Sequence, residues 1–183
     1  NGAGAVDQPE AEIKSFRAQA RSYFKASDFR ALEDMVAQIR SGPPVFATGS
    51  WRLYQFYGAI EPSRKESDEV WQQEEGILQA WEKAFPQSVT ARIAHANFLT
   101  SYAWRARGSG WANSVKEEGW KVFGERLTAA QKILTDAREM QPRCPMWWRV
   151  EMTVALGGGW DRAQEARLFA EAKKFFPQFY GYY

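Results

Sequence analysis

The segment 104–111 holds the densest set of side chains in this sequence that could bind a ligand. It reads Trp104-Arg105-Ala106-Arg107-Gly108-Ser109-Gly110-Trp111. An arginine beside a tryptophan in a glycine-hinged loop could grip a carboxylate or a phosphate. A structural role stays open, because Arg105 and Arg107 suit the negative end of a helix that stops at Gly108. The lysine of a Walker phosphate loop is absent from this spacing. We predict binding residues here, in a candidate groove formed by Trp104, Arg105, Arg107, Trp111 and His95.

His95 is the only histidine, and it stands among small residues in Ala91-Arg92-Ile93-Ala94-His95-Ala96-Asn97. An isolated histidine on such a helix favours a packed side chain over a catalytic one. A metal bound there would need carboxylates as its other ligands, and none has the spacing. The sequence therefore predicts no metal site, no cofactor and no catalytic residue.

Cys144 is the only cysteine, which excludes an internal disulfide and any multi-cysteine metal site. A nucleophilic Cys-His pair with His95 would require the two side chains to meet in space. We expect a cysteine of a loop or of the core instead.

Two pairs of adjacent acids, Glu74-Glu75 and Glu117-Glu118, raise the question of glycoside hydrolysis, which needs two carboxyl groups across a sugar ring. Adjacent residues on a helix point about 100° apart, so such pairs belong more often to a solvated face. We predict a solvated face for both pairs.

The composition indicates a globular protein with a sizeable core, since 45% of the 183 residues are hydrophobic and 25% are charged. Residues 1–85 hold 10 Lys+Arg and 13 Asp+Glu, and residues 86–183 hold 14 and 9, so the halves carry −3 and +5. This balance predicts no nucleic-acid partner. The nine tryptophans suggest large side chains between packed helices, or a stacking platform for a sugar or base.

No apolar run is long enough to span a bilayer, so we expect no transmembrane segment. The chain begins at Asn1 rather than at Met, which suggests that a preceding segment has been removed. We interpret this start as favouring a periplasmic or secreted protein over a cytoplasmic one, although trimming of a disordered start fits as well. The oligomeric state stays open.

Helical periodicity and helix-stop residues organise the chain into an all-α fold. Residues 1–8 are small and polar and predict a flexible segment, followed by one helical-repeat domain over residues 9–183. The piece 51–57 is assigned to a helix, although its aromatic residues would also allow a strand. The expected helices cover residues 9–24, 28–39, 51–57, 66–85, 88–107, 114–141, 146–156 and 160–176.

Three expected helices are followed by a proline, at Pro86, Pro142 and Pro177. In each case a residue expected to pack between helices stands five positions before the proline. The last two prolines are 35 residues apart, close to the period of about 34 residues in tetratricopeptide arrays. Ala130, Leu134 and Ala137 before Pro142, and Phe169 and Ala172 before Pro177, match the second helix of that repeat. We predict antiparallel helical hairpins stacked as a tetratricopeptide-like right-handed superhelix.

Several blocks of the sequence together form a recognisable pattern. They are Phe29-Arg30-Ala31-Leu32-Glu33, Gly49-Ser50-Trp51-Arg52-Leu53 with Tyr57, the run from Ala103 to Gly110, and Trp120, Phe123 and Leu127. This pattern resembles the bacterial DUF4034 family, whose function is unknown. The resemblance covers most of residues 25–145. It implies helical repeats and carries no assigned activity.

Two functional hypotheses follow. The first is a non-enzymatic module that binds a protein or a peptide, because stacked hairpins present an extended concave surface. The alternative is a ligand-binding protein or a hydrolase that acts on a cell-envelope glycan or a small metabolite through a cleft rich in tryptophan.

Overall fold

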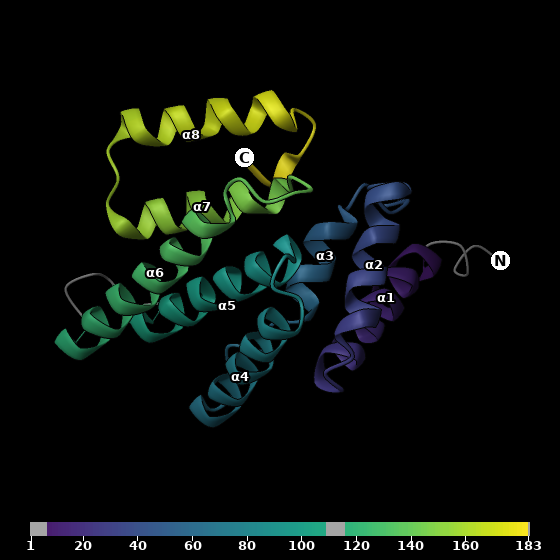
Figure 1. Ribbon diagram of the computed structural model, residues 1–183, viewed down its shortest axis with the longest axis horizontal. Helices are drawn as coiled ribbons and strands as arrows, with labels where there is room; N and C mark the ends of the chain where they lie inside the picture. Colours follow the sequence, from purple (N-terminus) through teal and green to yellow (C-terminus); the bar gives the residue numbers. More distant parts are fainter. Residues whose placement is uncertain (1–6, 109–115, 183) are drawn as a thin grey trace. The chain divides into compact units, whose positions relative to one another are not determined.

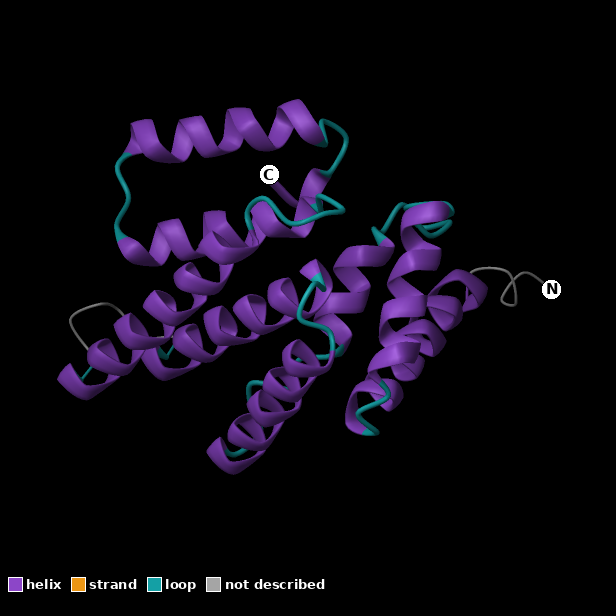
Figure 2. Cartoon of the chain, in the orientation of Figure 1, coloured by secondary structure: helices purple, strands orange, loops and turns teal. Residues whose placement is uncertain are grey.

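The computed structural model describes residues 7–108 and 116–182, and its regular elements are helices (Figures 1 and 2). Within these ranges no strand forms, and a single β-bridge joins Val45 to Trp51. The predicted all-α class is therefore confirmed. The chain divides into two compact units, residues 1–84 and 85–183, and the predicted domain over residues 9–183 includes both. Each unit is described by itself below.

Four helices form the first unit: α1 (Asp7–Lys25), α2 (Phe29–Ser41), α3 (Arg52–Ala59) and α4 (Asp68–Ala84). The first helix begins two residues before the expected boundary, so Asp7 and Gln8 are helical. Asp28 caps α2 by accepting a hydrogen bond from the backbone N–H of Ala31, as its place in the sequence predicts. The aromatic piece at residues 51–57 forms α3 and not a strand.

A buried ion pair holds the first unit together and corrects one expectation. Glu74, predicted to lie on a solvated face, is fully buried. Its carboxylate accepts hydrogen bonds from Arg21 at 2.6 and 2.8 Å and from Lys25 at 3.1 Å, both on α1. Glu74 stands three residues after Trp71 and four before Leu78, so it belongs to the apolar stripe of α4, where the two cations compensate its charge.

The second unit contains α5 (Val89–Arg107), α6 (Glu117–Ala137), α7 (Pro145–Gly158), α8 (Arg162–Phe175) and the short 3₁₀ helix η2 (Tyr180–Tyr182). Ser88 caps α5 through the backbone N–H of Ala91, and Asp161 forms a capping box with Gln164 at the start of α8. Gly108 ends α5 at a φ of 76°, a conformation that favours glycine.

Helix α7 extends farther than the sequence predicts. The expected helix ends at residue 156, yet α7 continues through Gly158 and is capped by Gly159, whose φ is 69°. Gly157 and Gly158 remain helical at the place where α7 packs closely on α6. A methyl group on Gly157 would lie 2.5 Å from Cδ1 of Leu127.

Successive helices of the second unit are antiparallel. Arg126 of α6 donates to the carbonyl of Tyr102 of α5 at 2.9 Å, and Trp147 of α7 donates to the carbonyl of Leu134 of α6 at 2.8 Å. Helix α7 contacts α5, α6 and α8. The small residues predicted at the close approaches, Ala130, Ala137 and Ala172, are all buried.

Candidate functional site

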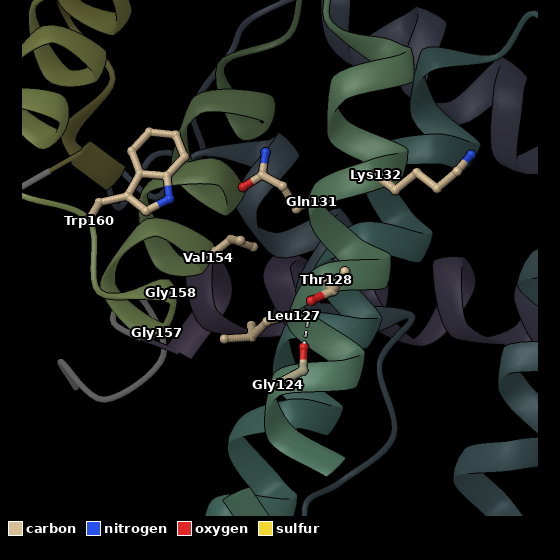
Figure 3. Close-up of a pocket in the computed structure, with 9 residues that line it drawn as sticks. All are labelled: Gly124, Leu127, Thr128, Gln131, Lys132, Val154, Gly157, Gly158 and Trp160. Carbon is tan, nitrogen blue, oxygen red and sulfur yellow. Dashed lines mark hydrogen bonds between the residues drawn. The ribbon is translucent and has the colours of Figure 1, made fainter. Parts of the chain in front are cut away.

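A groove of about 460 Å³ opens between α6 and α7 (Figure 3). One wall belongs to α6, the other to the end of α7, and Trp160 of the α7–α8 connection covers one side. The lining residues are Gly124, Leu127, Thr128, Gln131, Lys132, Val154, Gly157, Gly158 and Trp160. Most of this surface is apolar, so the groove is suited to apolar groups of a ligand.

Glycine shapes the groove on both walls. Gly124 lies inside α6, and apart from its own stretch of helix no atom of the described residues lies within 4 Å of the place where its Cβ would be, so the groove is open above it. Gly157 lies on the opposite wall, where a Cβ would meet Leu127 and also Cζ of Phe123 at 3.0 Å. The absence of a side chain at Gly157 therefore lets α7 approach α6, and its absence at Gly124 leaves space for a ligand.

An aromatic cluster lies next to the groove, toward the start of α6. The ring of Phe123 meets those of Trp104 and Trp120 edge to face, with centroids 5.1 and 5.6 Å apart. The guanidinium of Arg107 lies over both tryptophans, 5.5 Å from the centroid of Trp104 and 5.3 Å from that of Trp120. Trp120 is 37% exposed and stands four residues before Gly124 on the same face of α6.

The other end of the groove is polar. The amide of Gln131 donates to Oε1 of Glu151 on α7 at 2.8 Å. Glu151 is only 3% exposed, and this burial raises the pKa of its carboxyl, against the opposing effects of the Gln131 hydrogen bond and the charge of Arg138. Nearer the surface, the ammonium of Lys132 lies 3.4 Å from Asp136, and the Lys132 side chain is 79% exposed.

The polar side chains of the lining are mostly engaged within the protein. The hydroxyl of Thr128 donates to the carbonyl of Gly124 at 2.9 Å (Figure 3), and the amide of Gln131 is held by Glu151. No carboxylate is among the residues that line this groove. Its chemistry is thus an apolar trough, with a cation over aromatic rings at one end and an exposed ammonium at the other.

The structure brings together two of the five predicted site residues, Trp104 and Arg107. Arg105 is half-buried and lies two residues before Arg107, about 200° away around the helix. His95 is buried at 6% exposure and stands nine residues before Trp104, on the opposite face of α5 and about 13 Å along its axis. Trp111 lies outside the described residues.

The groove itself was not predicted from the sequence. Its strongest signal was Gly124, a glycine inside an otherwise good helical pattern. The positions Leu127 and Gln131 continue the same helical face. What the sequence could not show is that the end of α7 faces these residues.

A second, smaller pocket of about 340 Å³ lies in the first unit. Its lining residues are Phe16, Gln19, Met35, Gln38, Ile39, Pro43 and Arg52. Arg52 is the charged group of this pocket, and it bonds to Glu12 at 2.8 Å while its guanidinium lies 4.0 Å from the centroid of Phe46. Because the charge of Arg52 is already paired with that of Glu12, this pocket is a weaker candidate binding site than the groove on α6.

The described residues contain no cluster of three or more histidine, cysteine or acidic side chains that could hold a metal ion. Cys144 is a buried free cysteine at the N-cap of α7, in agreement with a cysteine of the core. Among the described helices none combines the length and the apolar character needed to cross a membrane.

Comparison with known proteins decides the family. The model of the DUF4034 family, described as a domain of unknown function, matches residues 16–146. The chain belongs to the DUF4034 family. No curated protein and no solved structure matches it significantly. The DUF4034 match includes the α6 wall of the groove, whereas Val154, Gly157, Gly158 and Trp160 of the other wall lie beyond it.

Proposed function

We propose that this DUF4034 chain is a non-enzymatic module that binds an extended peptide of a partner protein in the groove along α6. The observation that carries the proposal is the preformed, open apolar trough of about 460 Å³. The partly exposed ring of Trp120 stands one helical turn before Gly124 of its lining. A peptide could place apolar side chains in such a trough at little cost, because the lining helices need not rearrange.

The packing of the second unit supports a tetratricopeptide-like arrangement of its hairpins. In such arrays the first helix of each hairpin packs on both helices of the preceding one. Helix α7 has these neighbours, since it contacts α5, α6 and its own partner α8. Stacked hairpins commonly serve as scaffolds for peptide recognition, which agrees with the proposal.

The alternative is a ligand-binding protein or hydrolase for a glycan or a small metabolite. The volume of the groove would suit a small ligand. Two observations favour the peptide. Four tryptophans that could have formed a stacking platform are buried, namely Trp71, Trp81, Trp147 and Trp148. The lining also lacks the paired carboxylates that glycoside hydrolysis uses.

The test is a substitution that fills the groove without disturbing the core. A leucine at position 124 (Gly124→Leu) would extend into open space, and Gly76→Leu on α4 is the matched control, because Gly76 is also helical with nothing within 4 Å of its Cβ position. Both variants and the unchanged protein would be titrated against an array of capped hexapeptides with leucine or phenylalanine at the centre, with fluorescence anisotropy as the readout.

The proposal expects a set of peptides that binds the unchanged protein and the Gly76→Leu variant alike, and the Gly124→Leu variant about tenfold more weakly or worse. Equal binding to both variants, or no binding to the unchanged protein, would overturn it.

A further inference from the structure

Two positively charged side chains stand by the groove on α6: Lys132 is part of its lining, and Arg107 belongs to the aromatic cluster next to it. At the aromatic end Arg107 lies over Trp104 and Trp120. Within the described part of the chain its one hydrogen bond is long, 3.5 Å to the carbonyl of Gly108, and no carboxylate there pairs with it. Most donors of its guanidinium thus remain open to an anionic group.

Lys132 provides the second charge. Its side chain is 79% exposed, and its contact with Asp136 is a surface pair at 3.4 Å between residues four apart on one helix. Pairs of this kind contribute little, so the ammonium can turn to a ligand at small cost.

Two acidic side chains near the groove are engaged within the protein and do not pair with Arg107 or Lys132. Asp161, beside Trp160, uses its carboxylate to cap α8 through the backbone N–H of Gln164 at 2.8 Å. Glu151 is buried beneath Gln131. The second unit as a whole holds 14 Lys+Arg and 9 Asp+Glu, a net charge of +5, so its field also attracts an acidic segment.

The length of the groove sets the spacing of the charges that it can receive. Trp120, whose ring lies under the guanidinium of Arg107, stands twelve residues before Lys132 on α6. At 1.5 Å per residue the two positions are about 18 Å apart along the helix axis. An extended peptide advances about 3.3 Å per residue. A stretch of about five or six residues would therefore span the trough.

We infer that the peptide taken by the groove is acidic at both ends of a short apolar stretch, with carboxylates about five or six residues apart that meet Arg107 and Lys132. This inference rests on the proposed function and specifies its ligand. The apolar residues between the carboxylates occupy the trough between Leu127, Val154 and Trp160. Charge at both ends fixes the position and the register of the peptide.

Three synthetic heptapeptides test the inference. All have an acetylated N-terminus, an amidated C-terminus, leucine at positions 3 and 5 and glutamine at positions 2, 4 and 6, and they differ only in carrying glutamate, glutamine or lysine at positions 1 and 7. In an extended chain the odd-numbered side chains share one face, so the leucines and both terminal charges can face the groove together. With two exposed pairs formed, the glutamate peptide should bind about fivefold more tightly than the glutamine peptide, and the lysine peptide more weakly than both. The preference should shrink as salt is raised, because the charges are at the surface.

Charge-reversal variants show whether the preference for the glutamate peptide depends on Lys132. Lys132→Glu, at an exposed position where folding should not suffer, should remove most of the preference for the glutamate peptide. The control Lys174→Glu makes the same change in net charge in the last turn of α8, away from the residues that line the groove, and should leave the preference nearly unchanged.

Equal affinity for the three peptides would overturn the inference and leave the proposed function intact, since the groove would still bind peptides through apolar contacts alone. An equal loss of preference for the glutamate peptide in Lys132→Glu and Lys174→Glu would also overturn the inference. The preference would then come from the net charge of the protein and not from the groove. No binding of any peptide, together with no binding in the array, would contradict the proposed function itself.

Discussion

Two buried glutamates show how the same residue type is accommodated in different ways. Glu74 is compensated by Arg21 and Lys25, whereas Glu151 has the amide of Gln131 as its hydrogen-bond donor. In Glu151 the second carboxylate oxygen, Oε2, is buried and makes no hydrogen bond to the protein. A charged carboxylate is therefore costly at position 151 and well compensated at position 74.

Glu151→Gln should make the free energy of unfolding of the second unit less dependent on pH. Burial raises the pKa of Glu151 in the folded state above its value in the unfolded chain. The contribution of Glu151 to stability is hence fully present below the unfolded pKa and is lost as pH rises through the folded pKa. We expect the variant to be more stable than the unchanged protein at pH 7.5, with a smaller difference between them at pH 4.

Urea unfolding at a series of pH values measures this effect. Glu125→Gln, an exposed acid on α6, is the control and should leave the pH dependence as it is. An unchanged pH dependence in Glu151→Gln would contradict the account of this carboxyl.

Glu74→Gln should destabilise the first unit by about 2–3 kcal/mol, because a neutral amide replaces a buried carboxylate that binds two cations. The expected loss is moderated by the partial exposure of Arg21 and Lys25, which can turn to water. Glu75→Gln, one residue along the helix and half-buried, should cost less than about 1 kcal/mol. Chemical denaturation of both variants gives the comparison, and similar losses would argue against the ion pair as the cause.

At the scale of elements, helix α6 combines two requirements that usually conflict, stability and an open surface. Glycine inside a helix is unfavourable relative to alanine by about 0.5–1 kcal/mol, yet α6 runs without a break from Glu117 to Ala137 through Gly124. The packing of Leu127, Ala130 and Leu134, all buried, offsets this cost.

Alanine substitution should distinguish Gly124, which has open space at its Cβ position, from Gly157, whose Cβ would contact α6. Gly124→Ala and the control Gly76→Ala should each stabilise the protein by about 0.5–1 kcal/mol, because the new methyl group meets no atom. Gly157→Ala should destabilise it by about 1 kcal/mol, because the methyl group would press on the buried Leu127 and Phe123. Thermal unfolding followed by circular dichroism gives the order, and a stabilised Gly157→Ala would show that α7 can move away from α6.

Much of the element structure could be predicted from the sequence, because its signals are local. Asp28 and Ser88 cap α2 and α5, and Gly108 ends α5, as their residue types predict. The errors arose where packing between helices outweighs local preference. Burial of Glu74 depends on cations from α1, and the helical state of Gly157 depends on its contact with α6.

The candidate site was predictable only in part for the same reason. Trp104 and Arg107 are three residues apart, so their contact follows from helical spacing. Trp160 and Val154 meet Leu127 and Gln131 across the groove, and no local pattern connects such distant residues. His95 was predicted to share a groove with Trp104, although the helix places them on opposite faces of α5.

At the scale of the whole molecule, charge and family membership are distributed unevenly along the chain. The first unit carries −3 and the second +5, and the groove belongs to the positive unit. The match to the DUF4034 family begins at Phe16 inside α1, covers the rest of the first unit, α5 and α6, and ends at Met146. One wall of the groove thus belongs to the matched region and the other follows it, so recognition of a partner would depend on residues from both parts.

The central claim, that a peptide binds along α6, is tested most directly by the indole N–H signals of the tryptophans in a ¹H–¹⁵N spectrum. On titration with the glutamate-ended heptapeptide, the signals of Trp120 and Trp160 should shift with one common dissociation constant, because Trp160 lines the groove and Trp120 belongs to the aromatic cluster next to it. The signals of Trp71 and Trp81, fully buried in the first unit, should stay in place. Saturable binding that leaves Trp120 and Trp160 unmoved would contradict the account.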